Sequence, residues 1–392
     1  MKKYLIEGIL FLTYVLFAFA WAGSSIMSPE IMKTFDTGGL TMIAMATNMI
    51  AIAKIVGNIF AAWFLVKLGP KNVFTMASIL VILGGMGAFA SSYNLYLLSR
   101  LILGFGGALV LVVTAPIVMN TFKEPKSRMV ANALNADAFN TGNLIAVLGV
   151  GALMTLAGSW QTTMLTMAGL SAIAMLVWLF VGTNFDITKK DDGTSARGYT
   201  MKEGLKEKFN WTIAIGYSGL LFCYISVFTL FPNIPGFAIE SKYLSSIMIA
   251  GGMIGTTVGV FVVPKFIPQR VKALRWFGLG ITAFAAIAVT TSIPSLAMAA
   301  GLMCGVCMFS PMSSLLTMMQ EQSDTFPARV AIAAGIFWSA AYVLEMIYMT
   351  IATSIADSMN NPLVAAFIAV GMSSTIFLSS FFLKETNNKQ TN

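Results

Sequence analysis

Four charged residues inside long apolar runs of this chain are the candidates for chemistry, because a charge is costly there. They are Lys54, Arg100, Asp137 and Glu345. An ionisable group in the middle of a membrane costs roughly 2.5 to 3.5 kcal/mol even on the scale from insertion experiments, so such groups commonly bind ligands or carry protons. The two cations predict attraction of an anionic group, and the two acids predict proton transfer. Mutual neutralisation is the alternative, above all for Lys54 and Asp137.

Aromatic and amide residues recur at helical spacing around these charges. Residues three, four or seven positions apart lie on one face of a helix. Such faces are formed by Tyr14, Trp21 and Ser25; by Tyr217 and Tyr224; by Asp137, Asn140 and Thr141; and by Trp338, Tyr342 and Glu345. An aromatic, weakly polar wall suits a small organic solute. Packing between helices is the alternative explanation for each residue taken singly.

The two acids are the candidates for carrying a proton, with Glu345 preferred over Asp137. Burial raises the pKa of a carboxyl group towards neutral pH. Because the chain contains no histidine, carboxylates are the only side chains that are readily tuned to this task. A sodium site is the alternative, since Asn and Asp oxygens would serve either ion.

The composition indicates a membrane protein. With 57% hydrophobic and 10% charged residues and a mean hydropathy of +0.81, the chain has too little polar surface for a soluble globule. Runs of about 20 apolar residues span a bilayer as helices and are too long for barrel strands. They fall near 4–28, 40–66, 72–91, 95–119, 129–156, 161–182, 211–234, 243–265, 272–292, 295–320, 328–354 and 362–383. The prediction is an all-α membrane protein with twelve transmembrane helices.

An internal repeat divides these spans into two sets of six. Gly57 and the basic turn from Val66 to Val73 recur as Gly255 and the turn from Pro264 to Val271, at a constant offset of 198 residues (255 − 57, 271 − 73). We therefore expect two pseudo-symmetric six-helix bundles, 1–183 and 211–392, joined by a linker loop, 184–210. Duplicated halves are typical of secondary transporters.

Basic residues predict the orientation. Nearly all Lys and Arg outside the spans fall in alternate connections, whereas Lys33 and Lys242 stand alone on the other side. This asymmetry predicts that both termini and the linker are cytoplasmic, in a cell inner (plasma) membrane. The net charge of +8 then describes a collar at the inner leaflet. Nothing in its pattern favours nucleic-acid binding.

Two motifs carry a family resemblance. Val66-Lys67-Leu68-Gly69-Pro70-Lys71 partly meets a signature between the second and third spans, and Arg100-Leu101-Ile102-Leu103-Gly104-Phe105-Gly106-Gly107 matches a fourth-span pattern. The whole chain thereby resembles the major facilitator superfamily. The resemblance implies a central cavity, lined mainly by spans 1, 4, 7 and 10, that opens to each side in turn. The family's acidic residue falls on Val66, so gating by Lys67, Gly69 and Lys71 would lack its usual charge latch.

The resemblance and the polar faces together predict a transporter that imports a small polar, anionic organic solute by proton symport. The predicted solute-binding residues are Tyr14, Trp21, Lys54, Arg100, Asn140, Tyr217, Tyr224, Trp338 and Tyr342. Lys54 and Asn140-Thr141-Gly142-Asn143 faintly resemble nitrate and nitrite porters, but a second cation expected in span 8 falls on Gly252. Cyanate and nitroimidazole carriers are a broader likeness. Proton-coupled export of drugs or metabolites is the alternative, although span 5 lacks the proline typical of such exporters.

The sequence contains no motif that predicts catalysis or cofactor binding. Cys304 and Cys307 have a Cys-x-x-Cys spacing, but they lie in an apolar span with only Cys223 besides. There is no phosphate-binding glycine loop, so transport would draw on a gradient and not on ATP. We expect no metal, no cofactor and no nucleic-acid partner, and a monomer whose partners are the solute, protons and lipid.

Overall fold

The computed structural model describes residues 2–122, 124–185, 201–322 and 327–386. The chain divides into two units, Met1–Asp191 and Asp192–Asn392, called unit 1 and unit 2 below. The predicted linker falls mostly on 186–200, outside the described residues, and its described end carries the short helix α8 (Met201–Gly204). All regular secondary structure in the described residues is helical.

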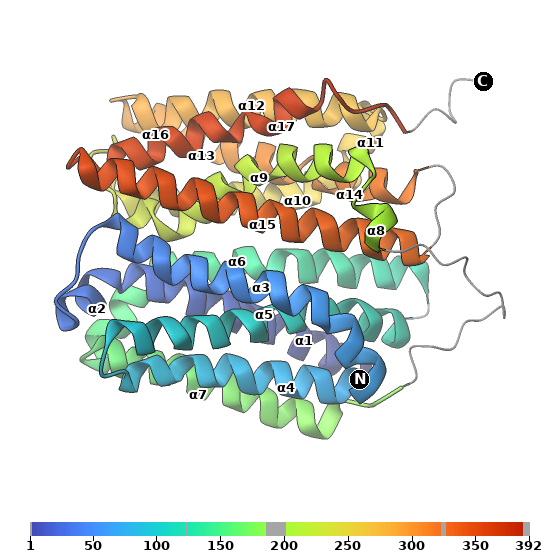
Figure 1. The fold of residues 1–392 in the computed structure, drawn as a ribbon, viewed down its shortest axis with the longest axis horizontal. Helices are drawn as coiled ribbons and strands as arrows, with labels where there is room; N and C mark the ends of the chain where they lie inside the picture. The colour runs from blue at the N-terminus through green and yellow to red at the C-terminus, as the bar shows by residue number, and fades with distance from the viewer. Residues whose placement is uncertain (1, 123, 186–200, 323–326, 387–392) are drawn as a thin grey trace. The chain divides into compact units, whose positions relative to one another are not determined.

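Unit 1 is a bundle of helices that lie side by side along most of their length (Figure 1). In it, α1 packs against α6 and α7, while α5 packs against α3 and α4. Its elements are α1 (Lys2–Ile26), α2 (Ser28–Thr34), α3 (Leu40–Leu68), α4 (Pro70–Leu83), the 3-10 helix η1 (Gly84–Phe89), α5 (Tyr93–Thr121), α6 (Pro125–Ala157) and α7 (Trp160–Val181).

Unit 2 repeats this arrangement. Here α9 packs against α15, and α13 packs against α10 and α12. After α8 its elements are α9 (Lys208–Thr229), the 3-10 helix η2 (Phe231–Asn233), α10 (Ser241–Phe261), α11 (Val263–Phe266), α12 (Arg270–Thr290), α13 (Pro294–Phe309), α14 (Met312–Gln320), α15 (Pro327–Ser358), α16 (Leu363–Ser373) and α17 (Thr375–Ser379).

The repeated glycine explains part of this internal symmetry. A Cβ on Gly57 would lie 2.6 Å from the Cβ of Ala108, and a Cβ on Gly255 would lie 2.5 Å from the carbonyl oxygen of Val306. Ala108 and Val306 are themselves 198 residues apart. In each unit the second span therefore approaches the fourth span through a glycine at the same register, because only glycine leaves the space.

The helices match the predicted spans closely. Among the described residues, eleven helices are long and apolar enough to cross a membrane, and a shorter apolar stretch covers Leu363–Ser379. The predicted all-α membrane fold is confirmed, with its last span divided between α16 and α17. At this division the hydroxyls of Ser373 and Ser374 donate to the carbonyls of Val370 and Gly371, each at 2.7 Å. Such bonds compete with the helical ladder.

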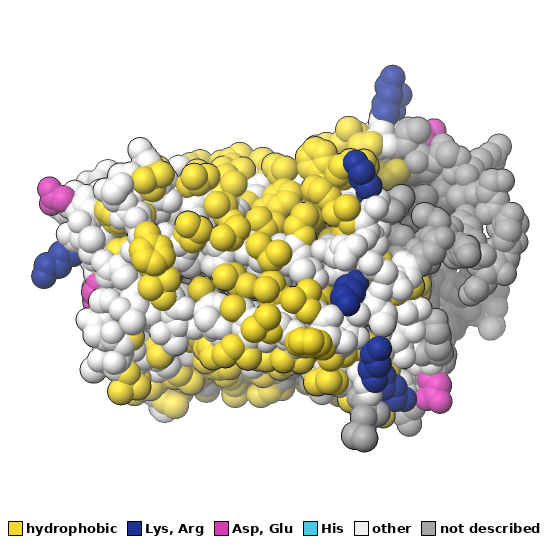
Figure 2. All heavy atoms as spheres, turned by 90° about the horizontal axis from the view of Figure 1, so that it is seen from below, with side chains coloured by type: hydrophobic (Ala, Val, Ile, Leu, Met, Phe, Trp, Pro, Cys, Tyr) yellow, Lys and Arg dark blue, Asp and Glu magenta, His cyan; other side chains and the backbone are white. Residues whose placement is uncertain are grey.

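The outer surface of the helices is apolar. Leu156 and Phe180 are 85% and 88% exposed, respectively, which is costly in water and favourable in lipid. Figure 2 shows one face of the molecule, on which yellow apolar side chains occupy the middle and the visible charged side chains gather at the two ends. This distribution is that of helices that span a hydrocarbon layer.

Candidate functional site

The Lys54 ammonium group lies inside a cluster of three aromatic rings in unit 1. Its Nζ atom is 4.9 Å from the ring centroid of Trp21, 5.3 Å from that of Phe139 and 5.5 Å from that of Phe17. Lys54 is only 2% exposed. Ring faces attract a cation, and the attraction strengthens where water is excluded. Lys54, Phe17, Trp21 and Phe139 are called the Lys54 cluster below.

Close helix packing positions this cluster. A Cβ on Gly107 of α5 would collide with the ring of Phe17, and a Cβ on Gly142 of α6 would collide with the carbonyl of Val15. Gly104 likewise brings α5 against the backbone of Ile50, one turn before Lys54 on α3. These glycines bring α1, α3, α5 and α6 close enough for rings from α1 and α6 to surround the ammonium group that α3 supplies.

The predicted face of α1 meets α6 at Phe139. The ring centroids of Tyr14 and Trp21 each lie 5.6 Å from that of Phe139. Asn140 and Asn143, which follow on α6, are fully buried. The structure thus brings Tyr14, Trp21 and Lys54 together, with Asn140 adjacent in the chain to their shared contact. Phe139 was missed in the sequence, because a lone phenylalanine in an apolar helix has the signature of ordinary packing.

Asp137 lies two residues before Phe139 on α6. The hydroxyl of Thr141 donates to its backbone carbonyl at 2.9 Å, so the predicted face of Asp137, Asn140 and Thr141 is continuous. Lys54 reaches the ring of Phe139 on this same helix. The acid therefore stands close in sequence to the part of α6 that forms the Lys54 cluster.

Arg100 belongs to a different cluster of unit 1. Its side chain is 1% exposed and donates to the carbonyl of Gly84 and, at 3.2 Å, to the hydroxyl of Ser99. The guanidinium carbon is 5.0 Å from the ring centroid of Tyr96, which also contacts Phe35, Tyr93 and Trp160. None of these partners of Arg100 belongs to the Lys54 cluster. A solute-binding role for Arg100 stays a prediction.

In unit 2 the predicted residues divide between two helix contacts. The ring of Tyr217 on α9 meets that of Trp338 on α15 edge-on at 5.5 Å, and Trp338 lies 6.2 Å from Tyr342. Glu345, fully buried, follows three residues after Tyr342 on α15. Tyr224 instead meets Phe309 of α13 at 4.8 Å. Glu345, Trp338, Tyr342 and Tyr217 are called the Glu345 cluster below.

The three predicted gating residues lie at the turn between α3 and α4. Gly69 has φ +78° and ψ 159°, a conformation that favours glycine. The backbone N–H of Lys71 donates to the Asn184 side chain, and its Nζ donates to the Leu179 carbonyl, both at 2.9 Å. Lys67 is exposed, with its Nζ 4.7 Å from the Trp63 ring. Lys71 therefore attaches this turn to the end of α7 and the segment after it, and the gating role of all three residues stays a prediction.

One buried acid was missed. Glu7 on α1 is 7% exposed, and its Oε1 accepts a hydrogen bond of 2.7 Å from the amide of Asn135 on α6. Its position inside the apolar run 4–28 was the available signal. A glutamate so near the start of a span looked like part of the polar N-terminus.

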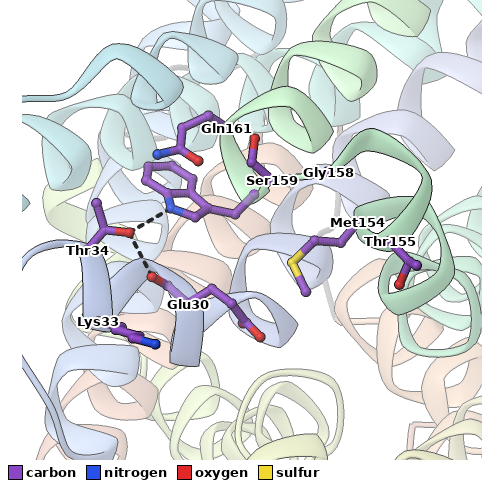
Figure 3. A pocket seen from close by; sticks show the side chains of 9 residues that line it. Glu30, Lys33, Thr34, Met154, Thr155, Gly158, Ser159 and Gln161 are labelled. Atoms are coloured by element: carbon purple, nitrogen blue, oxygen red, sulfur yellow. Dashed lines mark hydrogen bonds between the residues drawn. The ribbon is translucent and has the colours of Figure 1, made fainter.

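Two surface pockets in the described part of the chain lie apart from the predicted solute-binding residues. One, of about 390 Å³, is enclosed by α2 and the turn from α6 to α7, with Glu30, Lys33, Ser159 and Gln161 at its wall (Figure 3). The other, of about 360 Å³, lies by the start of α9 and the segment after α17. Neither contains a predicted solute-binding residue. The described residues also hold no group of three metal-ligating side chains.

Comparisons with known proteins agree with this architecture. The family described as Major Facilitator Superfamily matches residues 10–347. An uncharacterized protein of Campylobacter jejuni is 29% identical over 230 residues, covering 58% of this chain and 70% of its own. One of Mesomycoplasma hyopneumoniae is 22% identical over 358 residues, covering 82% and 72%.

Solved structures show the same fold. The fucose:proton symporter of E. coli aligns with a TM-score of 0.65 at 16% identity, covering 97% of this chain and 99% of its own. A D-xylose-proton symporter aligns with a TM-score of 0.70 at 14% identity, covering 99% of each chain. At these identities the likeness concerns the fold alone.

Proposed function

Because this chain belongs to the major facilitator superfamily, we propose that it imports a small, anionic organic solute together with protons. Membership of this family makes the protein a multi-pass membrane transporter and not an enzyme. The observation that carries the choice of solute is the buried Lys54 ammonium group within its three aromatic rings.

The Lys54 cluster combines the two interactions that a small organic anion needs. A carboxylate that reaches Lys54 accepts a charge-assisted hydrogen bond, worth about 1.5–3 kcal/mol. The rings of Trp21 and Phe139 supply apolar surface for the body of the solute. The neighbouring amide of Asn140 and, in unit 2, the aromatic residues Tyr217, Tyr224, Trp338 and Tyr342 are the further solute-binding candidates, and Arg100 contributes positive charge.

Proton coupling is assigned first to Glu345 and second to Asp137. Glu345 is fully buried on α15, three residues after Tyr342, where a carboxylate is costly and proton binding removes the charge. Loading and unloading this proton would accompany alternating access, with the turn at Lys67, Gly69 and Lys71 taking part in gating. The two solved symporters of the same fold are, by their titles, proton-coupled sugar carriers.

The asymmetry of basic residues supports a location in the inner or plasma membrane with both termini cytoplasmic. On this assignment the turn between α3 and α4 and the segment after α17 face the cytoplasm. The proposal takes the monomer as the transporting species, since each unit holds its own candidate cluster.

The test is uptake by protein reconstituted into proteoliposomes. Small carboxylates, amino acids, inorganic anions, neutral sugars and cationic drugs are first screened by thermal shift, and uptake of each hit is measured under an imposed pH gradient. We expect acid-driven uptake of an organic anion that falls about 10- to 100-fold at limiting solute in Lys54→Ala, the equivalent of about 1.5–3 kcal/mol. Lys33→Ala, on exposed α2, is the matched control.

Other outcomes contradict separate parts of the proposal. Uptake of a neutral sugar that is unaffected by Lys54→Ala would contradict the proposal that the solute is an anion. Uptake that depends on a sodium gradient in place of the pH gradient would contradict the proposal that the coupling ion is a proton. Extrusion of lipophilic cations in exchange for protons, insensitive to Lys54, would favour the exporter.

A further inference from the structure

The carboxyl group of Glu7 and the amide of Asn135 form a buried polar pair between α1 and α6. The Asn135 Nδ2 atom donates to Glu7 Oε1 at 2.7 Å and to the Ala131 carbonyl at 3.1 Å, which uses both of its hydrogens. Glu7 Oε2 and Asn135 Oδ1 are both buried and have no hydrogen-bond partner among the described residues. Two adjoining groups therefore each keep one unsatisfied oxygen.

A single proton would satisfy both oxygens. With a proton on Oε2, Glu7 becomes a carboxylic acid that can donate to Asn135 Oδ1 while its Oε1 still accepts from Asn135 Nδ2. An ionised Glu7 offers no donor, so Asn135 Oδ1 stays unsatisfied and the charge stays buried. The pair is thus arranged for the protonated form of Glu7.

Among the described residues, no cation is paired with Glu7. The helices packed against α1 carry the following charged groups: Lys54 in its aromatic cluster and Lys67 over Trp63 on α3, Arg100 against Gly84 on α5, Asp137 on α6, and Glu30 and Lys33 on α2, which follows the far end of α1. Lys126 and Arg128 precede on α6, with side chains outside the described residues, and α7 has no titratable residue.

The exposed, basic N-terminal end of α1 lies close to Glu7. Residues 2–5 are exposed, including Tyr4 at 66% and Leu5 at 48%, whereas Glu7 is 7% exposed. Lys3 extends over the ring of Tyr4, with its Nζ 5.1 Å from the ring centroid. Glu7 is therefore the first buried acid met from the N-terminal end of the helix, within one turn of solvent.

We propose that Glu7, paired with Asn135, is a proton-binding site through which unit 1 exchanges a proton with water at the N-terminal end of α1. In the packed arrangement the proton is bound to Oε2; its O–H bond breaks when water reaches the pair, leaving the carboxylate and a hydrated proton. This assignment rests on the proposed proton coupling. It adds a proton-exchange step on the same face of α1 as Tyr14 and Trp21, about two turns nearer the N-terminus than Tyr14.

The test reads the carboxyl group itself and needs no solute. Infrared difference spectra of the reconstituted protein are recorded between alkaline and acidic buffer, where a protonated carboxyl gives its own carbonyl band. We expect a titrating band that is lost in Glu7→Gln, which keeps the size and the acceptor for Asn135. The band should be retained in Glu240→Gln, because Glu240 is exposed. An unchanged spectrum in Glu7→Gln overturns the proposal.

Asn135→Ala keeps the acid and removes its partner, and it serves also where Glu7→Gln fails to fold. We expect the midpoint of the Glu7 band to move in this variant, and an unmoved midpoint overturns the pairing. Once a solute is known, uptake by Glu7→Gln should lose its dependence on external pH. The same uptake is measured for Glu345→Gln on its own, so that the effects of the two acids are distinguished. Wild-type pH dependence in Glu7→Gln would overturn the exchange role, whereas solute uptake without any proton dependence in the wild type would instead overturn the proposed function.

Discussion

The Lys54 cluster of unit 1 and the Glu345 cluster of unit 2 use similar helix packing and opposite charge. α1 packs on α6 in unit 1, and α9 packs on α15 in unit 2, with aromatic rings at both contacts. Yet the position 198 residues after Lys54 is Gly252, and the position 198 residues before Glu345 is Val147. The duplication kept the packing and let the charges diverge. The proposed attraction of an anion by Lys54 and the proposed coupling proton of Glu345 thus fall in different units and can be removed separately.

The largest expected effect is the loss of energy coupling in Glu345→Gln. A difference of about one pH unit supplies about 1.4 kcal/mol per proton, enough to accumulate a solute about tenfold by one-to-one symport. Glu345→Gln should abolish this accumulation, because glutamine cannot bind and release the proton. It should still exchange labelled for unlabelled solute across the membrane. Lys54→Ala should lower both activities, about 10- to 100-fold at limiting solute, since the solute itself binds more weakly. Counterflow and pH-driven uptake in proteoliposomes distinguish the two.

Glu321→Gln provides the control for a carboxylate of unit 2 outside the cluster. Glu321 accepts from Arg270 at 3.2 Å and is partly exposed. Its accumulation ratio should stay close to that of the wild type. Tenfold accumulation in Glu345→Gln would place the coupling proton elsewhere and would move Asp137 to first choice.

The difference between the clusters could be read only partly from the sequence. Helical spacing put Tyr14 and Trp21 on one face, and the structure brings both rings to Phe139. Helical spacing could not identify Phe139. Which ring of α6 meets α1 depends on how closely the two helices approach at Gly142. Helix rotation is a tertiary property, and periodicity within one span does not encode it.

Charges near the ends of spans were harder to interpret than charges near the middle. Lys54 and Glu345 stood out because apolar residues flank them on both sides. Glu7 lies next to the basic N-terminus and looked solvated, but packing of α1 on α6 buries it. Arg100 stood out as a charge, yet the carbonyl it meets comes from the 3-10 helix after α4, which apolar periodicity does not predict.

The second expected effect tests whether the two units use the duplicated glycine equally. Gly57→Ala and Gly255→Ala should each destabilise the protein by about 1–3 kcal/mol, the usual range for overpacking. Gly255→Ala should be the worse, because its Cβ meets the backbone oxygen of Val306, whereas that of Gly57 meets the Ala108 side chain. Thermal unfolding in detergent, followed by circular dichroism, measures both.

Gly149→Ala is the matched control for these two variants. Nothing lies within 4 Å of a Cβ at this position, so alanine should be neutral or stabilise the helix by about 0.5–1 kcal/mol. If Gly57→Ala and Gly255→Ala unfold at the same temperature as Gly149→Ala, close approach at the repeated glycine does not hold the second and fourth spans together.

The smallest expected effect concerns how each unit caps the helix that follows the repeated turn. In unit 1 the Asn184 side chain accepts from Lys71 N–H at 2.9 Å, whereas in unit 2 the Glu385 carboxylate accepts from the N–H groups of Arg270 and Val271 at 2.7 and 3.0 Å. Asn184→Ala removes a neutral cap, worth about 0.5–2 kcal/mol, at any salt concentration. Glu385→Gln keeps an acceptor and removes only the charge at the helix N-terminus, worth about 0.3–1 kcal/mol at low ionic strength and screened by salt.

Melting temperatures at low and high salt distinguish these two caps. As salt rises, the melting temperature of Glu385→Gln should approach that of the wild type, whereas that of Asn184→Ala should stay below it. Equal salt dependence of the two would mean that the carboxylate of unit 2 acts as a hydrogen-bond acceptor alone, and that the two caps differ in residue type but not in physics.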